Sequence, residues 1–284
     1  MATFYNQASL SLGGSVINSN ITEGEIVSGA GLTKTAASAN YGPGDGITYV
    51  VSIVNNGVTE YSGLTLTDDL GRFTAPGGIE VVPLTFVQGS VLYYIDGVLQ
   101  PAPEAEEVDG QLLVRGINVP AGGNVTVIYE ARANGFAPLG AAASITNTVT
   151  AGGTSCELSD SATVPTRDEP SLTISKSVCP QVVTCSGEVT YTIVVQNSGN
   201  TAVVATDNLI VSDLFNPLLS DITVTINGEA LAEGTGYTYN TETGEFATLP
   251  GAVPVPAATF TRDPVTGLIT TTPGVAVITV TGNI

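Results

Sequence analysis

Residues 47–57 read Ile47-Thr-Tyr-Val-Val-Ser-Ile-Val-Asn-Asn-Gly57. Every second residue shares one face, as expected of a half-buried β-strand, and these residues are Ile47, Tyr49, Val51 and Ile53. The Asn56-Gly57 pair then marks a turn. Half a chain later, Val189-Thr-Tyr-Thr-Ile-Val-Val-Gln-Asn-Ser-Gly199 repeats the strand and the turn. The sequence therefore predicts the same strand twice.

The repeat extends well beyond this strand. Lys34 and Lys176, the only lysines of the 284-residue chain, lie half its length apart. Further matches keep their order along the chain: Leu66-Thr67-Asp68 with Val211-Ser212-Asp213, Val119-Pro120-Ala121 with Val255-Pro256-Ala257, and Val127-Ile128 with Val277-Ile278. A tandem duplication of this kind predicts two similar domains in a row and an architectural role.

The composition argues against catalysis. The chain has no His, so the usual general base near neutral pH and the commonest metal ligand are both missing. Charged residues make up only 12% of the chain, and it contains 33 Gly and 16 Pro, which indicates an apolar, turn-rich, all-β protein. We therefore predict a protein that is not an enzyme and that binds no cofactor and no metal.

The net charge of −19 at pH 7 excludes nucleic acid as an ordinary partner, because phosphates would be repelled. No apolar run approaches the length of a membrane span, so we expect no membrane partner either. The acidic stretches at residues 68–69 and 104–109 lack the ligand spacing of an EF-hand. We interpret the acidic excess as a means of keeping a protein with many β-edges soluble.

We predict two immunoglobulin-like β-sandwiches over residues 28–168 and 169–284, preceded by an N-terminal donor hairpin over residues 1–27. The first sandwich is expected to close with a pair of strands between residues 145 and 164. The second copy reaches Ile284 without a counterpart of these strands, so we expect it to be incomplete. An incomplete sandwich exposes an apolar face and an unpaired edge.

The missing strands resemble the start of the chain. Residues 4–27 follow the pattern of residues 145–169, with Asn6 at the position of Asn147. We therefore predict that the hairpin of one subunit completes the second sandwich of the next, a head-to-tail contact between copies of the same chain that propagates into a filament. The donated face consists of alternate residues: Phe4, Asn6, Ala8, Leu10 and Leu12. The alternative is that the hairpin folds back within its own chain.

Three segments resemble a known family: Tyr49-Val-Val-Ser-Ile-Val-Asn-Asn-Gly57, Leu66-Thr-Asp-Asp-Leu70 and Ile145-Thr-Asn-Thr-Val-Thr150. They are similar to the bacterial conserved-repeat β-sandwich called domain of unknown function eleven, whose members are structural proteins of surfaces and appendages. A two-repeat chain without a signal peptide resembles most the ribbon-appendage proteins of clostridial endospores.

This resemblance implies the structural subunit of an extracellular filament on a spore or cell surface, with an anchoring protein as a further partner. The start of the chain, residues 1–6, lacks the basic and apolar regions of a secretory signal, which fits release by lysis of the mother cell. The alternative is a surface adhesin or ligand-binding module whose loops hold a ligand. Filaments formed by the purified protein alone would favour the structural role.

The three cysteines Cys156, Cys179 and Cys185 have no counterparts in the first copy. Cys179 and Cys185 flank a short loop and could form a disulfide with each other. That pairing would leave Cys156, near a hairpin tip, to bridge a neighbouring subunit in an oxidising setting. Three unpaired thiols are the alternative.

Strand parity turns a lysine, an acid and an asparagine inward in both copies. The trios are Lys34, Asp68 and Asn147 in the first copy, and Lys176, Asp213 and Asn6 of the next subunit in the second. They resemble the parts of autocatalytic Lys–Asn isopeptide crosslinks in other Gram-positive surface sandwiches, where burial favours the neutral amine and the protonated acid. We predict one crosslink within a chain and one between subunits. The alternative is a buried Lys–Asp pair hydrogen-bonded to the asparagine.

Overall fold

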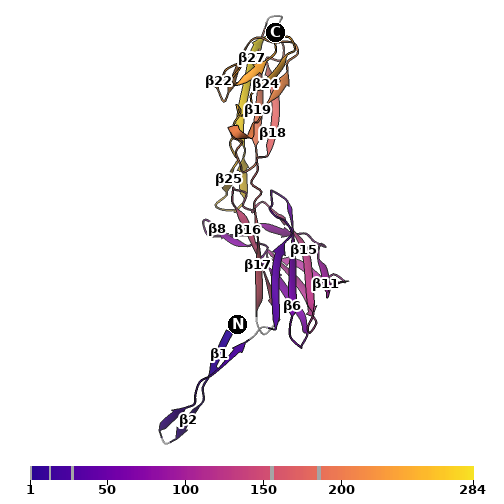
Figure 1. Cartoon of the computed structure of the whole chain (residues 1–284), viewed down its shortest axis with the longest axis vertical. Coiled ribbons are helices and arrows are strands. Elements are labelled where there is room, and N and C mark those ends of the chain that lie inside the picture. Colours follow the sequence, from indigo (N-terminus) through magenta and orange to yellow (C-terminus); the bar gives the residue numbers. More distant parts are fainter. Residues whose placement is uncertain (1, 13, 27–28, 154–156, 184–186) are drawn as a thin grey trace.

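The computed structural model describes residues 2–12, 14–26, 29–153, 157–183 and 187–284. Almost all of the regular structure in these ranges is β-strand, and their one helix is the short 3-10 helix η1 (Ala205–Asp207). None of the described helices is long and apolar enough to cross a membrane. Figure 1 shows an elongated molecule in which a hairpin, a first β-sandwich and a second β-sandwich follow one another. The all-β fold predicted from the sequence is confirmed.

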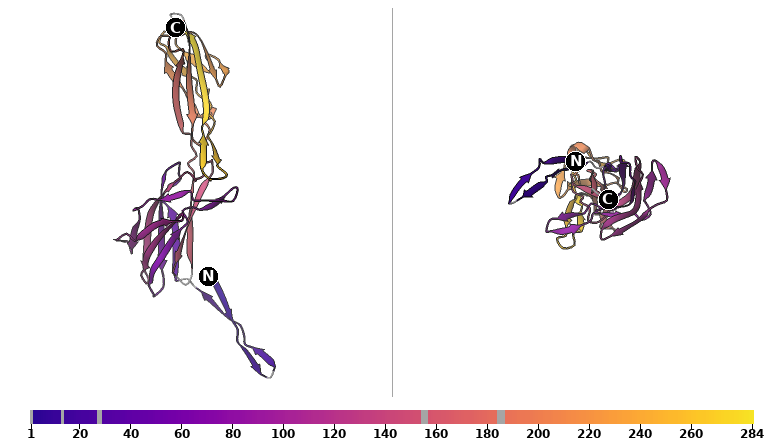
Figure 2. Two further views of the ribbon diagram at one scale, coloured as in Figure 1. Left: turned by 180° about the vertical axis from the view of Figure 1, so that it is seen from behind. Right: turned by 90° about the horizontal axis from the view of Figure 1, so that it is seen from below.

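The N-terminal hairpin is a two-stranded ribbon. β1 pairs with β4 and β2 pairs with β3, all antiparallel, and their bounds are β1 Ala2–Asn6, β2 Ser9–Leu12, β3 Ser15–Asn18 and β4 Thr22–Ile26. Between the two pairs, the backbone N–H of Ser19 donates to the carbonyl oxygen of Ala8 at 2.8 Å. Among the described strands none pairs with this ribbon, and Figure 2 shows it projecting away from the first sandwich. Such an isolated hairpin gains little stability from its own contacts.

The first sandwich packs two antiparallel sheets together. One has the order β12-β11-β15-β6-β5, with β10 also paired to β15, and the other has the order β13-β14-β7-β16-β17. The strands of the first sheet are β5 Ala30–Ala36, β6 Gly46–Asn55, β10 Leu84–Phe86, β11 Leu92–Ile95, β12 Val98–Gln100 and β15 Asn124–Ala133. Those of the second sheet are β7 Tyr61–Asp68, β13 Glu104–Val108, β14 Gln111–Val119, β16 Ser144–Gly152 and β17 Leu158–Pro165. A small hairpin, β8 Phe73–Ala75 with β9 Ile79–Val81, lies beside them.

Alternation along the strands builds the core of this sandwich. The odd-numbered apolar residues of β6 from Ile47 to Ile53 are buried, as the two-residue period predicts. β15 pairs with β6 so that Tyr129 lies opposite Tyr49. The facing sheet completes the core with buried residues that include Leu64, Leu66, Val114, Ile145 and Val149.

The second sandwich is built from a sheet of order β18-β19-β27-β21-β22, a three-stranded sheet of order β20-β24-β23 and the hairpin β25-β26. The bounds are β18 Leu172–Cys179, β19 Glu188–Asn197, β20 Ser212–Leu214, β21 Ser220–Ile226, β22 Glu229–Leu231, β23 Tyr237–Tyr239, β24 Glu245–Thr248, β25 Thr259–Arg262, β26 Ile269–Thr272 and β27 Gly274–Asn283. A separate hydrophobic core forms between the sheets and includes Val189, Ile193, Phe215, Phe246 and Ile278.

The two sandwiches differ at one edge. In the first, β7 lies between β14 and β16, and β17 extends the sheet beyond β16. In the second, β20 pairs with β24, and no described strand takes the places of β16 and β17. β18, the counterpart of β5, is consequently exposed along nearly all its length, and Ile174 is 63% exposed.

One detail of the repeat needs correction. Tyr49 pairs with Tyr129 in the first sandwich, whereas its counterpart Tyr191 pairs with Val280 in the second. The expected match of Val127-Ile128 with Val277-Ile278 is therefore wrong by one residue, because the shared Val-Ile dipeptide lies one position out of register with the ladder. The true counterpart of Tyr129 is Val280.

The hairpin β25-β26 joins the two sandwiches and lies at their junction in Figure 1. The backbone N–H of Ile269 donates to the carbonyl oxygen of Gly135 in the first sandwich at 2.9 Å. Arg262 donates from Nη2 to the carbonyl oxygen of Phe136 at 3.0 Å, and its guanidinium lies 5.3 Å from the ring centre of Phe73. The second sandwich thus contacts the first through hydrogen bonds to backbone oxygens and a cation–π contact.

A parallel contact closes the first sandwich where the chain leaves it. Tyr41 and Thr166 form a parallel bridge, in which the N–H of Tyr41 donates to the carbonyl oxygen of Pro165 at 3.0 Å. The N–H of Arg167 donates back to the carbonyl oxygen of Tyr41 at 2.8 Å. The first and last segments of this sandwich therefore run side by side in the same direction.

Candidate crosslinking sites and assembly face

Lys34 lies on β5 with its side chain fully buried. Strand parity places it on the same face as Leu32 and Ala36, which pack against the core. Its Nζ donates to Oδ2 of Asp68 at 2.5 Å, across the sandwich from β5 to β7. Its backbone N–H donates to Oδ2 of Asp160 on β17 at 2.7 Å. A lysine is seldom fully buried without a partner, and the partner of Lys34 here is Asp68.

Asp68 ends β7 and is buried. Its Oδ1 accepts the backbone N–H of Leu70 at 3.0 Å, which fixes the orientation of the carboxyl group. Its Oδ2 accepts the hydroxyl of Tyr129 in addition to the amine of Lys34. One carboxyl oxygen therefore connects an amine and a phenol.

Asn147 lies on β16 and is completely buried. Its Nδ2 donates to the hydroxyl oxygen of Tyr129 at 3.2 Å, and its Oδ1 accepts the backbone N–H of Gly71 at 3.2 Å. Gly71 has φ +74, and a Cβ there would come within 2.6 Å of Cγ2 of Ile145. Glycine at this turn is what lets a backbone N–H reach the side-chain carbonyl of Asn147.

Burial determines the charge states at this site. Desolvation lowers the pKa of Lys34, with Asp68 opposing the shift, and raises the pKa of Asp68, with Lys34 opposing that shift. Both changes favour a neutral amine and a neutral carboxyl group. The ring centre of Tyr49 lies 4.8 Å from Nζ of Lys34, and the Tyr49 and Tyr129 rings stack 5.5 Å apart, so aromatic walls surround the pair.

This arrangement holds the groups that an isopeptide bond needs. A neutral amine is a nucleophile, and a side-chain amide whose oxygen accepts a hydrogen bond is polarised for attack. The structure brings Lys34, Asp68 and Asn147 into one buried network, as the trio was predicted, although Tyr129 links the acid to the amide. Whether the bond forms or the ion pair persists stays a prediction, which an intact-mass measurement checks.

Tyr129 and Tyr49 also belong to the site, although the sequence did not predict them as members. Both sit at inward positions of their strands, so the two-residue period indicates only that they belong to the core. The available signal was the hydroxyl of Tyr129, because a buried tyrosine hydroxyl usually finds a partner, whereas the buried hydroxyl of Tyr49 makes no hydrogen bond with any described residue. Tyr129 finds two partners, Asp68 and Asn147.

The second copy contains the lysine and the acid of this site, and we call this pair the half site. Lys176 on β18 forms an ion pair with Asp213 on β20, and its Nζ lies 4.4 Å from the ring centre of Tyr191 and 5.0 Å from that of Phe215. The Lys176 side chain is 38% exposed and that of Asp213 is 17% exposed. Oδ2 of Asp213 contacts the amine but accepts no hydrogen bond of normal geometry from any described residue. No described asparagine takes the place of Asn147.

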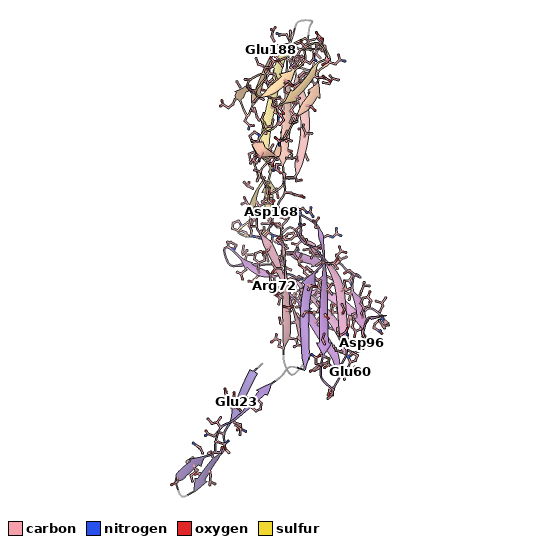
Figure 3. The ribbon with its side chains drawn as sticks, viewed as in Figure 1. Glu23, Glu60, Arg72, Asp96, Asp168 and Glu188 are labelled. Atoms are coloured by element: carbon pink, nitrogen blue, oxygen red, sulfur yellow. The ribbon has the colours of Figure 1, made fainter. Side chains whose placement is uncertain are left out.

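The predicted donor residues lie far from this half site within one chain. Phe4 and Leu10 are 52% and 63% exposed on the hairpin, Asn6 and Ala8 are exposed beside them, and the side chain of Leu12 falls outside the described residues. Figure 3 labels Glu23 on the hairpin and Glu188 on the second sandwich, and they stand on opposite sides of the first sandwich. The structure therefore does not bring Asn6 and Lys176 of one chain together.

The cysteine predictions stay open. Cys179 is exposed at the end of β18 and makes no disulfide among the described residues, and Cys156 and Cys185 lie outside those residues. Within the described ranges, no group of three or more His, Cys, Asp or Glu side chains is placed to hold a metal ion.

No protein-family model matches the sequence, and no curated protein matches it. Similar solved structures include BcpA, the major pilin subunit of Bacillus cereus, with 12% identity over 98% of this chain and 74% of that chain and a TM-score of 0.37. The pilus backbone (RrgB) from Streptococcus pneumoniae has 12% identity over 86% of this chain and 55% of that chain, with a TM-score of 0.35. A structure named BspA_C_WT has 15% identity over 89% of this chain and 91% of that chain, with a TM-score of 0.36. TM-scores this low carry no argument about function, and the resemblance to the conserved-repeat family likewise stays a prediction.

Proposed function

We propose that this protein is the structural subunit of a self-assembling extracellular filament, in which the N-terminal hairpin of one subunit completes the second sandwich of the next. The observation that carries the proposal is that the chain has a projecting hairpin at one end and a sandwich edge of matching kind at the other. At one end stands a hairpin with exposed apolar side chains that pairs with no other described strand. In the sandwich at the other end, β20 has one edge with no described partner, and β18 is exposed.

The first sandwich serves as a template for the docked state. There β16 pairs with β7 so that Val149 lies opposite Asp68, and β17 covers the outer edge of β16. With Asn6 in the place of Asn147, the same register puts Ala8 opposite Asp213. The hairpin supplies both strands at once, because its returning strand takes the place of β17.

Apolar burial favours this docking. Phe4 and Leu10 on the donor, and Ile174 on the acceptor, are more than half exposed in the single chain. Burying each large apolar side chain contributes about 1.5–3 kcal/mol. Several such contributions offset the cost of association, which is roughly 4–15 kcal/mol. An exposed face and open edge of this kind would otherwise favour aggregation.

The geometry of the contact favours an open polymer. Donor and acceptor lie at opposite ends of an elongated chain (Figure 1), so the contact joins two different surfaces. Such heterologous contacts build filaments unless a rotation closes them into a ring. The same separation argues against the hairpin folding back onto the second sandwich of its own chain.

The test is electron microscopy and sedimentation of the purified chain with and without residues 1–12. The full chain should form filaments, and the truncated chain should stay monomeric with an unchanged circular dichroism spectrum. Leu10→Asp should weaken assembly roughly tenfold to a hundredfold, since about 1.4 kcal/mol corresponds to a factor of ten. Ser11→Asp, on the opposite face of the same strand, is the matched control and should assemble normally. Identical filaments from the truncated chain would contradict the proposal.

The location on a spore or cell surface, and an anchoring protein there, rest on the family resemblance described above. Immunogold labelling of the producing cells would test both, with label expected on surface fibres. Label confined to the cell interior of vegetative and sporulating cells would contradict them.

A further inference from the structure

The two lysines occupy equivalent positions in two sites, and only the first of these sites also contains a described asparagine. Each lies on the first strand of its sandwich and forms an ion pair with the equivalent acid across the sandwich, Lys34 with Asp68 and Lys176 with Asp213. In the first site, Asn147 on β16 completes the set. In the second sandwich no described strand takes the place of β16 and its asparagine, and Asn6 lies on the strand proposed to fill that place.

We propose that docking completes the second site, so that Lys176 and Asn6 of the next subunit form an isopeptide bond that locks the assembled contact covalently. The inference rests on the proposed function, because the two residues meet only if the hairpin docks. It adds a modification site whose two halves come from different subunits.

The register of the first sandwich places the reacting groups. Asn147 lies two residues before Val149, and Val149 pairs with Asp68. In the docked state Ala8 takes the place of Val149 opposite Asp213, and Asn6 then takes the place of Asn147. Side chains two residues apart on a strand share a face, so Asn6 points into the sandwich toward Lys176.

The acid of the second site has fewer partners among the described residues than the acid of the first. Oδ2 of Asp213 touches the amine of Lys176, yet no described group donates a well-formed hydrogen bond to it. In the first site the corresponding oxygen of Asp68 accepts two donors, Lys34 and Tyr129. Val280 replaces Tyr129, so the incoming amide of Asn6 can reach Asp213 directly, without an intervening phenol.

Exposure explains why the bond would wait for docking. The Lys34 side chain is fully buried, whereas that of Lys176 is 38% exposed and in contact with water. Covering β18 with the docked hairpin removes that water, and desolvation favours the neutral, nucleophilic amine. Tyr191 and Phe215 already form the aromatic wall on the inner side. Docking therefore activates the amine at the moment when it delivers the electrophile.

The reaction needs no other reactant. A proton passes from the ammonium group of Lys176 to the carboxylate of Asp213, which leaves a neutral amine and a carboxylic acid. Nζ attacks Cγ of Asn6 while the acid donates its proton to the amide oxygen. The tetrahedral intermediate collapses, the bond from Cγ to Nδ2 breaks, and the former amide nitrogen leaves as ammonia with the proton lost by Nζ. As the carbonyl re-forms, the hydroxyl proton of the intermediate returns to Asp213 and passes on to the departing ammonia, which leaves as ammonium. Asp213 ends as the carboxylate, and each bond costs the chain one ammonia.

Wild-type filaments boiled in detergent and reductant should run as a ladder of covalent multimers, because the reductant removes any disulfide contribution. Peptide mapping should find Lys176 joined to Asn6 with the loss of one ammonia. Filaments of Asn6→Ala and of Lys176→Arg should keep their appearance but boil apart to monomers. Asn18→Ala, which alters an exposed asparagine on β3 of the same hairpin, is the matched control and should keep the ladder.

The outcomes separate this inference from the proposed function. If wild-type chains form no filaments, the proposed function fails and the crosslink fails with it. If filaments form but boil apart to monomers, the crosslink alone is wrong. A ladder that survives in both Asn6→Ala and Lys176→Arg would assign the bond elsewhere and overturn the inference. If Asn6→Ala does not assemble, Lys176→Arg decides, because it leaves the donor strand intact.

Discussion

The two sandwiches present the same lysine and the same acid in two states of completion. In the first, β16 and β17 cover the pair and bury it together with an asparagine. In the second, those strands are missing among the described residues, and the lysine reaches solvent. The comparison teaches that two strands decide whether these residues form an internal site or an open one, since the side chains themselves hardly differ.

The largest expected effect is a difference in stability between variants that remove one or the other ion pair. Lys34→Ala leaves the carboxyl group of Asp68 buried without its partner and should lower the free energy of unfolding of the first sandwich by about 3–5 kcal/mol. Lys176→Ala removes a partly exposed pair and should cost the free subunit less than about 1 kcal/mol. Urea unfolding of monomeric variants lacking residues 1–12 measures both changes. Equal losses would show that the two sites do not differ in burial as described.

A second variant makes the first site more like the second. Tyr129→Phe keeps the ring but removes the hydroxyl that joins Asp68 to Asn147, and Val280 offers no hydroxyl at the equivalent position. Losing this hydroxyl leaves buried polar groups without a hydrogen-bond partner and should lower the stability of the first sandwich by roughly 1–3 kcal/mol.

The same variant tests the crosslink in the first site. Wild-type monomer should show an intact mass lower by one ammonia, from a bond between Lys34 and Asn147, and Tyr129→Phe should lose that ammonia more slowly.

The control for this variant is Tyr93→Phe, whose hydroxyl also bonds within the first sandwich but only to the backbone of Asn118, away from Lys34. It should leave the mass change intact. A wild-type monomer with the full unmodified mass would show that the first site is a buried ion pair and nothing more.

The smallest expected effect concerns the junction between the sandwiches. Arg262→Ala removes the hydrogen bond to Phe136 and the cation–π contact with Phe73, together about 1–2 kcal/mol, and also the hydrogen bond to the carbonyl oxygen of Gly267 within the hairpin. Amide hydrogen exchange in β25 and β26 should speed up by roughly tenfold, because local opening becomes easier. Arg132→Ala, which alters a largely exposed arginine in an ion pair with Glu130, should leave exchange there unchanged. Unchanged exchange in Arg262→Ala would mean that the backbone contacts alone hold the junction.

The inward direction of the three residues in the first sandwich could be predicted because successive side chains of a strand point to opposite faces. Every second residue therefore shares a face. Lys34, Asp68 and Asn147 each follow apolar residues of the same parity, so their direction is set by the local pattern. The order of the repeated segments likewise predicted that the second copy has no counterpart of β16 and β17, and no described strand takes their places. Neither inference needed knowledge of which strands pair.

The remaining features depend on contacts that local patterns do not encode. The place of Tyr129 in the network follows from its cross-strand register, and a one-residue error in matching the last strand hid its replacement by Val280. Arg262 bonds to a backbone oxygen of the other sandwich, and its hairpin has no counterpart in the first copy. Gly71 signals a turn in the sequence, but its contact with Asn147 arises only when β16 packs beside β7.

The parallel bridge between Tyr41 and Thr166 has a mechanical consequence. In a filament under tension, force enters the first sandwich at the start of β5 and leaves it beyond Thr166. Because these segments run side by side in the same direction, a lengthwise pull shears them past each other. The hydrogen bonds of Tyr41 with Pro165 and Arg167, and that of Lys34 with Asp160, then share the load together rather than breaking one after another.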